Sequence, residues 1–359
     1  MNDKDYINLA FKLAKKGKGL VSPNPLVGAV LVKDGKVIGK GYHKKCGSDH
    51  AEVDAIRKAK KDVSGSTLYC NLEPCCHIKK QTPPCVPIII QKKIKKVVIS
   101  NIDPNKEVNG KGIKQLREAG IEVVTGVLET EGKELNKFYF KQIKEKLPYI
   151  TLKIAQSIDG KIGLLKKKQL WLTGKESLKY VHELRSEYDA ILVGAGTIKS
   201  DNPQLTVREI QGRNPIRIII DGTLISPLNS KIFKENFEER TWIFTSSKSN
   251  IRKKQKLLDS GVRIFNLTPS KNKMLNLKKI LSILSENKIT SILVEGGAEI
   301  FSQFIKSGLF DEIIVLRAPI ILGKGIDGPM ISKYKKLLLL ETQRLGNDIK
   351  LVYGKNFYD

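Results

Sequence analysis

Cysteine and histidine, two residue types well suited to binding a transition metal, are concentrated in one short stretch of this 359-residue chain. The chain has five cysteines, none beyond residue 85, and its opening residues do not resemble a secretory signal. An odd number of cysteines in such a chain argues against a disulfide framework and for reduced thiols that bind metal or react. The stretch contains Cys46, Cys70, Cys75, Cys76 and Cys85, together with His43, His50 and His77.

The spacing of His50, Glu52, Cys75 and Cys85 is typical of a catalytic zinc site. One imidazole and two thiolates balance the charge of Zn²⁺ and leave a fourth position for water, whose pKa falls toward neutrality on the metal. We expect Glu52, at the start of a helix, to shuttle the proton of that water. An apolar helical stretch follows Cys85, and a helix N-terminus favours a thiolate. H-x-E, then P-C and a further cysteine, is the pattern of zinc-dependent deaminases of nucleosides and nucleobases.

Alternating helical and strand-like patterns surround these residues and predict a layered α/β domain. The Asp34-Gly35 pair suits the tight turn of a hairpin. Before residue 147 we expect helices at 5–15, 50–61, 112–120 and 128–146, a short helix after Cys85, and strands at 26–32, 36–42, 66–73, 95–100 and 121–127.

A second α/β domain follows a break at Leu147-Pro148, since a proline ends the preceding helical pattern. We therefore predict one domain at 1–146 and another at 147–359. In the second we expect helices at 176–187, 277–287 and 298–308, and strands at 149–157, 190–196, 216–222, 241–246, 291–297 and 311–322.

Composition limits the classes of partner. Lys and Arg number 64 against 37 Asp and Glu, a formal net charge of +27, but the lysines are scattered and aromatic residues make up only 6%. Without basic and aromatic residues interleaved, we expect a small anionic metabolite and no nucleic acid. No run approaches the roughly 18 apolar residues of a membrane span, so we expect no membrane partner and a cytoplasmic location. The sequence leaves a homo-oligomer open.

Four segments of the first half together resemble the deaminase of riboflavin biosynthesis, a domain often fused to a reductase. They are residues 22–30, 41–53, 73–77 and 82–85. The resemblance implies a three-layer α/β/α fold like that of cytidine deaminase. It implies that the zinc ligands are His50, Cys75 and Cys85, that Glu52 is the catalytic proton shuttle, and that Asn24, His43 and His77 bind the substrate.

The loop between the ligand cysteines departs from the family pattern, because it has one residue more than usual. Counting from Glu73 makes Cys75 the ligand, whereas counting back from Cys85 selects Cys76. We prefer Cys75, whose position is fixed by the strand before it, and Cys76 stays the alternative. The changed loop also leaves open whether Lys79 or Lys80 contacts a phosphate.

In the second half, glycines follow two strands, at Gly194 to Gly196 and at Gly296-Gly297. Such turns either cradle a dinucleotide phosphate at a helix N-terminus or simply permit tight packing. The pattern lacks the third glycine of the usual dinucleotide fingerprint, since Lys199 stands there. The residues alone leave both interpretations open.

Residues 152–160, 171–173, 184–185, 194–208 and 294–297 look like the reductase domain of riboflavin biosynthesis. The resemblance implies an α/β fold like that of dihydrofolate reductase, with NADPH as hydride donor. It implies that Ala155, Trp171, Thr197, Asp201 and Gly297 bind the cofactor, and that Gln169, Arg185, Leu205, Arg208 and Glu295 bind the substrate. His182 lies in a helical pattern, which predicts a structural role.

The whole chain is thus predicted to be a bifunctional enzyme that deaminates a phosphoribosylated pyrimidine with Zn²⁺ and then reduces its ribosyl group with NADPH. One alternative is a deaminase that acts on nucleic acid, which leaves residues 148–359 without a role. Another is a zinc- and nucleotide-binding module without catalysis, for which Glu52 would be unnecessary.

Overall fold

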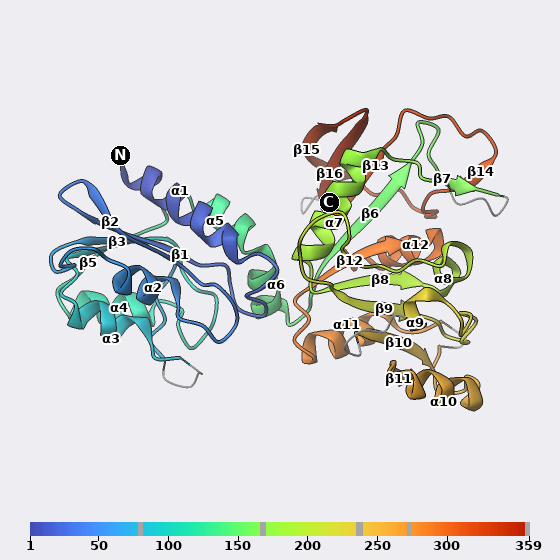
Figure 1. Cartoon of the computed structure of the whole chain (residues 1–359), viewed down its shortest axis with the longest axis horizontal. Coiled ribbons are helices and arrows are strands. Elements are labelled where there is room, and N and C mark those ends of the chain that lie inside the picture. Colours follow the sequence, from blue (N-terminus) through green and yellow to red (C-terminus); the bar gives the residue numbers. More distant parts are fainter. Residues whose placement is uncertain (78–81, 166–169, 235–239, 271–273, 356–359) are drawn as a thin grey trace. The chain divides into compact units, whose positions relative to one another are not determined.

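A computed structural model describes residues 1–77, 82–165, 170–234, 240–270 and 274–355 (Figure 1). The chain divides into two compact units, Met1–Lys146 and Leu147–Asp359. Within the described residues, no helix combines the length and the apolar character that crossing a bilayer requires.

The first unit is built on a five-stranded sheet in the order β2-β1-β3-β4-β5. β1 pairs antiparallel with β2 and with β3, whereas β3, β4 and β5 are parallel. The hairpin between β1 and β2 turns at Asp34 and Gly35, both with positive φ, as expected. The strands are β1 Gly28–Lys33, β2 Lys36–Tyr42, β3 Thr67–Leu72, β4 Lys96–Asn101 and β5 Glu122–Thr125.

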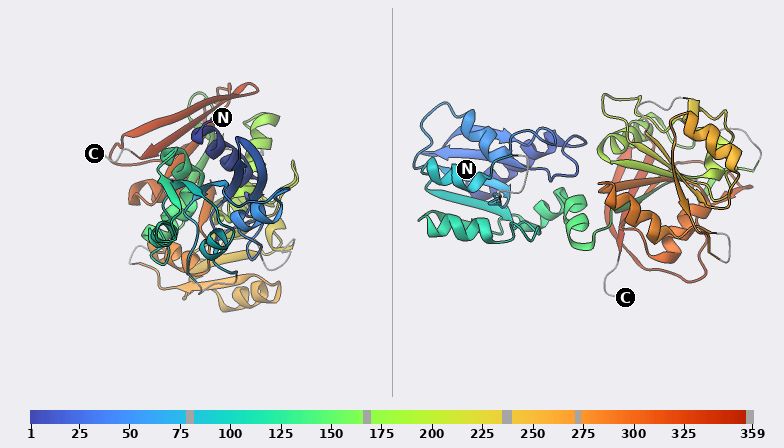
Figure 2. Two further views of the ribbon diagram at one scale, coloured as in Figure 1. Left: turned by 90° about the vertical axis from the view of Figure 1, so that its left-hand side faces the viewer. Right: turned by 90° about the horizontal axis from the view of Figure 1, so that it is seen from below.

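Helices cover both faces of this sheet, as Figures 1 and 2 show. Apolar residues of α2, α3 and α4 share one buried cluster with one face, and those of α1 share a second cluster with the other. The predicted three-layer α/β/α architecture is therefore confirmed. The helices are α1 Asp3–Ala14, a 3₁₀ turn Lys15–Gly17, α2 Ala51–Arg57, α3 Cys85–Gln91, α4 Lys111–Glu118, α5 Glu129–Leu135 and α6 Lys137–Glu145.

The single closing helix predicted at 128–146 is wrong, because the chain forms α5 and α6 with a break at Asn136. Asn136 is 3% exposed, and its side chain binds the backbone of Leu26. Its Oδ1 accepts from the Leu26 amide at 2.8 Å and its Nδ2 donates to the Leu26 carbonyl at 3.0 Å. These long-range bonds compensate for the lost helical continuity.

The second unit contains a nine-stranded sheet in the order β11-β10-β9-β8-β12-β6-β13-β16-β15, and a separate pair, β14-β7. The strands from β11 to β13 in that order are parallel, and the hairpin of β15 and β16 adds the antiparallel edge. The strands are β6 Tyr149–Gln156, β7 Lys161–Leu164, β8 Ala190–Gly194, β9 Ile216–Ile220, β10 Thr241–Ser246, β11 Arg263–Leu267, β12 Ser291–Gly296, β13 Glu312–Arg317, β14 Gly325–Asp327, β15 Leu337–Leu345 and β16 Asp348–Lys355.

Buried clusters lie on both faces of the larger sheet. One contains residues of α11 and α12, and the other contains residues of α8, α9 and α10. The predicted α/β class is confirmed, although α10, β11 and the hairpin of β15 and β16 were not predicted. The strand predicted at 190–196 ends at Gly194, and α8 begins at Ala195. The helices are α7 Lys175–Glu187, α8 Ala195–Asp201, α9 Lys231–Lys234, α10 Ile251–Asp259, α11 Leu277–Glu286 and α12 Ala298–Ser307.

Candidate functional site

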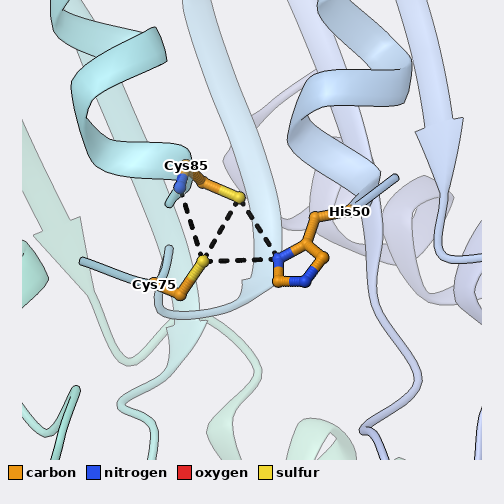
Figure 3. A group of neighbouring side chains, drawn as sticks. All are labelled: His50, Cys75 and Cys85. Atoms are coloured by element: carbon orange, nitrogen blue, oxygen red, sulfur yellow. Dashed lines mark hydrogen bonds between the residues drawn. The ribbon is translucent and has the colours of Figure 1, made fainter. Parts of the chain in front are cut away.

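His50, Cys75 and Cys85 converge at one point in the first unit (Figure 3). His50 Nδ1 lies 3.3 Å from the Sγ atom of each cysteine, and the two sulfur atoms lie 3.4 Å apart. An ion bound to all three atoms at the usual Zn–S distance of about 2.3 Å and Zn–N distance of about 2.0 Å requires donors about this far apart. The donor set therefore fits a zinc ion.

Three elements bring these side chains together. His50 is the N-cap residue of α2, Cys75 follows β3, and Cys85 is the first residue of α3. The Cys85 amide donates to the Cys75 carbonyl at 3.0 Å, which fixes the two cysteines relative to each other. The Oγ1 of Thr82, which was not among the predicted site residues, lies 3.0 Å from His50 Nε2 and leaves Nδ1 facing the sulfur atoms.

Cys76, the alternative ligand, is not part of this cluster. Its Sγ lies 3.7 Å from the carbonyl oxygen of Glu107 and is partly exposed. Lys79 and Lys80 lie outside the described residues, so the structure says nothing about their predicted contact with phosphate.

Glu52 lies in the first turn of α2 and is only 3% exposed. Burial raises the pKa of its carboxyl, and the nearby Cys75 thiolate raises it further. Within the described part of the chain, Glu52 Oε2 has no hydrogen-bond partner. The candidate zinc ligands His50, Cys75 and Cys85 are thus accompanied by a buried carboxyl group with an oxygen that is free to exchange a proton.

Two of the predicted substrate residues, Asn24 and His43, are in contact with each other. His43 Nδ1 donates to the Asp49 carbonyl at 3.0 Å, so its Nε2 accepts from Asn24 Nδ2 at 3.2 Å. Burial lowers the pKa of His43, which favours this neutral ring. The ring centres of His43 and His50 lie 5.5 Å apart, so the Asn24–His43 pair borders the candidate zinc ligands.

His77, the third predicted substrate residue of this unit, follows Cys76 and is partly exposed. Its Nδ1 is buried and has no hydrogen-bond partner within the described ranges. The imidazole therefore has a polar atom available for a ligand.

Glu73 was not among the predicted site residues, but in the structure it anchors the region beside Cys75. Its buried carboxylate accepts hydrogen bonds from the amides of Asp103, Gly110, Gly112 and Ile113, at 2.9 to 3.3 Å. Glu73 therefore holds the loop before α4, and the start of that helix, against the end of β3 where Cys75 follows. Its place directly before Pro74-Cys75 was the available sequence signal.

The carboxyl ends of parallel strands β6, β8 and β12 meet at one edge of the larger sheet, and several predicted residues meet there. Arg185 donates to Glu295 through Nε at 2.6 Å and Nη2 at 2.8 Å. Lys153, which was not among the predicted site residues, places Nζ 3.4 Å from Glu295 Oε2. A lysine within the apolar strand 150–155 was the signal that could have identified it.

The same cluster determines the ionisation of Glu295. Burial alone raises the pKa of this carboxyl, but the charges of Arg185 and Lys153 and their hydrogen bonds outweigh burial and bring it to about 2. Arg185 Nη1 also donates to the Thr206 carbonyl at 3.1 Å, which joins the cluster to the segment that carries Leu205 and Arg208. Leu205 is buried and Arg208 is exposed.

The glycines at this edge permit close packing. A Cβ on Gly194 would approach Ile300 to 2.7 Å, and one on Gly296 would approach Thr197 Oγ1 to 2.7 Å. Gly297 has φ +89° and begins α12 as its N-cap. The packing interpretation therefore holds for Gly194 and Gly296, and their small size brings Thr197 beside the N-terminus of a ten-residue helix. Such an N-terminus fits the phosphates of NADPH.

The other predicted cofactor and substrate residues lie as follows. Ala155 is in β6, two residues from Lys153 and thus on the same face of the strand. Trp171 is 62% exposed, and Asp201 is an exposed residue at the end of α8. Gln169 lies outside the described residues.

Fold and site together define the class of the protein. A three-layer α/β/α domain with a histidine, two cysteines and a buried glutamate is typical of a zinc-dependent deaminase. The second domain adds a parallel sheet with a helix N-terminus at its carboxyl edge, a common place for a dinucleotide. The structure thus indicates a deaminase joined to a reductase.

Comparison with known proteins assigns the family. Residues 1–101 match the cytidine and deoxycytidylate deaminase zinc-binding region, and residues 148–351 match the RibD C-terminal domain. The riboflavin biosynthesis protein RibD of Aquifex aeolicus is 45% identical over 98% of both chains. The chain belongs to the RibD family of bifunctional riboflavin biosynthesis enzymes, which supports Zn²⁺ and NADPH as its cofactors.

Two solved structures resemble the whole chain. RibD of Acinetobacter baumannii is 34% identical, covers 99% of both chains and has a TM-score of 0.88. A diaminohydroxyphosphoribosylaminopyrimidine deaminase/5-amino-6-(5-phosphoribosylamino)uracil reductase from Thermotoga maritima is 38% identical, covers 99% of both chains and has a TM-score of 0.87.

Proposed function

We propose that residues 1–146 deaminate 2,5-diamino-6-hydroxy-4-(5-phosphoribosylamino)pyrimidine, and that residues 147–359 then reduce the ribosyl group to give 5-amino-6-(5-phosphoribitylamino)uracil. The observation that carries this proposal is the convergence of His50, Cys75 and Cys85 beside the buried Glu52. The activity named for the Thermotoga maritima protein supports the choice of substrate.

In the deamination, His50, Cys75 and Cys85 hold the zinc ion. Zinc, when bound, supplies a Lewis acid that makes water a good nucleophile near neutral pH. Glu52 takes up the proton that the attacking water loses and returns it to the substrate, so that the amine leaves as ammonia and a carbonyl replaces it. Because one oxygen of Glu52 has no partner among the described residues, its carboxyl can perform both transfers without breaking a protein hydrogen bond.

Asn24, His43 and His77 orient the pyrimidine. Asn24 is held by the neutral His43 ring and leaves its amide oxygen for the substrate. His77 supplies the buried Nδ1 that has no partner within the described residues. These three groups provide both donors and acceptors, which a pyrimidine with amino and carbonyl substituents requires.

In the reduction, NADPH supplies the hydride when it is bound, and the protein positions both reactants. Thr197 of α8 and Gly297, the N-cap residue of α12, hold its phosphates, with Ala155, Trp171 and Asp201 as further contacts. The substrate lies against Leu205, Arg208 and the pair formed by Arg185 and Glu295, with Gln169 as an additional contact. Since Glu295 occupies two donors of Arg185, the exposed Arg208 is the better placed arginine for the substrate phosphate.

We also propose that the chain forms a homo-oligomer in the cytoplasm. β15 is an edge strand of the nine-stranded sheet, and it exposes three consecutive leucines. Their exposed fractions are 44% for Leu338, 58% for Leu339 and 59% for Leu340. An apolar edge strand is a surface on which a second copy can pair. Sedimentation of the purified chain distinguishes a monomer from an oligomer.

The proposed function is tested with the purified full chain by following ammonia release and NADPH oxidation separately after addition of the diaminopyrimidine. Ammonia should appear first and NADPH should then be consumed. Zinc-loaded protein that releases no ammonia would overturn the deaminase assignment, and ammonia release without NADPH oxidation would overturn the reductase assignment.

A Glu52→Gln variant provides the matched control, because it keeps the shape of the side chain and removes the proton shuttle. Ammonia release should fall about a thousandfold, as expected when a general acid-base group is lost. Zinc content should be unchanged, and NADPH oxidation should return when the deaminated pyrimidine is supplied directly.

A further inference from the structure

The segment 204–208 has no regular secondary structure, and side chains from other parts of the second unit hold its backbone. Arg185 Nη1 donates to the Thr206 carbonyl at 3.1 Å. Asn214 Oδ1 accepts from the amide of Val207 at 2.8 Å. The backbone of the segment is therefore held by side chains of residues that lie outside it in the sequence.

His182 provides a further anchor. Its Nδ1 accepts a hydrogen bond from the Arg208 amide at 2.9 Å. His182 and Arg185 are three residues apart on α7, so they lie on the same face of the helix. One helix face therefore holds the segment at two points, the carbonyl of Thr206 and the amide of Arg208.

The segment needs such anchors because Leu205 has a left-handed backbone. Its φ is +55°, a region that residues with a side chain rarely adopt, and its side chain is only 3% exposed. A backbone of this kind persists only where its surroundings determine it. Loss of an anchor should therefore release Leu205 and the residues that follow it.

The protonation of the His182 ring indicates that its Nδ1 is there to accept the hydrogen bond from the Arg208 amide. Burial, followed by the charges of Arg185 and Arg208, lowers the pKa of His182 to about 4, so the ring is neutral near neutral pH. Since Nδ1 accepts, Nε2 carries the hydrogen, and this buried N–H has no partner in the part of the chain that is described. An unpaired buried donor is unfavourable, so packing alone does not account for a histidine here.

We propose that His182 is a positioning residue for the reductase, whose Nδ1 anchors the Arg208 amide and thereby sets where Leu205 and Arg208 meet the phosphoribosylamino substrate. The proposal rests on the proposed assignment of Leu205 and Arg208 to the substrate site. His182 acts through the segment and does not itself contact the reacting atoms.

The test compares two variants of the full chain. His182→Leu removes the acceptor, and His182→Asn restores an acceptor oxygen close to the position of Nδ1. In reduction of the deaminated pyrimidine, His182→Leu should raise KM for that substrate about tenfold, as expected for the loss of one hydrogen bond. Its kcat and its KM for NADPH should change less than twofold, and His182→Asn should restore most of the substrate KM.

A double-mutant cycle separates positioning from a general structural role. Because part of the proposed effect passes through the Arg208 side chain, His182→Leu should raise KM by clearly less than tenfold in an Arg208→Ala background. An equal tenfold effect in both backgrounds, or an unchanged KM in the single variant, would overturn the proposal. Ammonia release by the same chain serves as the internal control and should not change.

Hydrogen exchange gives a readout that does not depend on the substrate. Amides of residues 204–208 should exchange faster in His182→Leu than in the parent or in His182→Asn. If the parent consumes no NADPH with this substrate, the proposed function fails, and the exchange rates still decide whether His182 anchors the segment. Unchanged exchange in His182→Leu would refute the anchor.

Discussion

Two buried glutamates, Glu52 in the first domain and Glu295 in the second, have pKa values shifted in opposite directions. Burial and the neighbouring Cys75 thiolate raise the pKa of Glu52. Burial acts in the same direction on Glu295, but Arg185 and Lys153 bring its pKa down to about 2. Burial therefore does not set the charge of a carboxyl group by itself, because the nearest counter-charge decides it.

The two sites also differ in how the chain assembles them. The proposed zinc ligands and Glu52 come from residues 50–85, and hydrogen bonds between Cys75 and Cys85 fix the two cysteines relative to each other. The proposed reductase site draws on β6, α7, β12 and the segment 204–208, which lie far apart in the sequence and meet only in the folded domain. Zinc binding and activity at the first site should therefore depend on a few ligand atoms. The stability of the second site should depend on the ion pairs among Arg185, Lys153 and Glu295.

The largest effect is expected from replacing a single sulfur in the first site. Cys75→Ser should remove zinc from the purified chain and lower ammonia release by at least about a thousandfold, because a zinc site of this kind needs all three protein ligands. Cys76→Ser is the matched control and should keep zinc and activity, since Cys76 Sγ contacts the Glu107 carbonyl. Elemental analysis and the ammonia assay measure both. If Cys76→Ser lost zinc and Cys75→Ser kept it, Cys76 rather than Cys75 would be the zinc ligand.

The next largest effect concerns the charge network of the second site. Glu295→Gln leaves Arg185 and Lys153 without their counter-charge, although the side chains are only 11% and 12% exposed. Removal of one partner from a buried ion pair costs about 3 to 5 kcal/mol of unfolding free energy. Urea unfolding followed by tryptophan fluorescence reports this domain alone, because both tryptophans, Trp171 and Trp242, lie in it.

Asp327→Asn is the control for this prediction, because it breaks an ion pair with Lys161 in the same domain. Asp327 is 67% exposed, so its loss should cost less than about 1 kcal/mol. Equal losses in the two variants would mean that the Glu295 network does not hold the reductase site together.

The sequence predicted the first site better than the second for a physical reason. His50, Cys75 and Cys85 lie close together in the chain, and their types and spacing already limit the chemistry. Lys153 and His182 have no such motif. Each becomes informative only when folding places it beside Glu295 or Arg208, more than 20 residues away along the chain.

The errors in the predicted fold have a similar origin. The helical pattern of 128–146 is real, but a bond between Asn136 and Leu26 interrupts it, and no local pattern reveals a partner so distant. β15 was missed because its leucines stand in one run and are exposed, whereas an edge strand with one buried face would alternate. α10 was missed because it is short and mostly polar.

The smallest predicted effect tests whether the first domain really tolerates buried carboxyl groups without counter-charge. Asp103 is 6% exposed, and burial raises its pKa to about 6, with Glu73 and Cys75 adding to the rise. The amide of Asn105 and the hydroxyl of Tyr139 donate to its Oδ1 at 2.8 and 2.9 Å and oppose the rise in part. The folded state thus binds this proton more tightly than the unfolded state does.

The sign of the pH dependence follows from that difference. The stabilising contribution of protonated Asp103 is complete below pH about 4 and is lost as the pH rises through about 6. Asp103→Asn keeps an acceptor for both donors and cannot ionise. It should therefore be more stable than the parent at pH 8, by about 2 to 3 kcal/mol, and nearly equal to it near pH 4.

Hydrogen exchange of peptides from residues 1–146 measures this difference in the full chain. Asp34→Asn removes the same charge from the exposed turn between β1 and β2 and should show no such pH dependence. If Asp103→Asn were less stable than the parent at pH 8, the charged form of Asp103 would be the favoured one. The first domain would then compensate its buried carboxyl groups as the second does, and the contrast between Glu52 and Glu295 would not extend beyond those two residues.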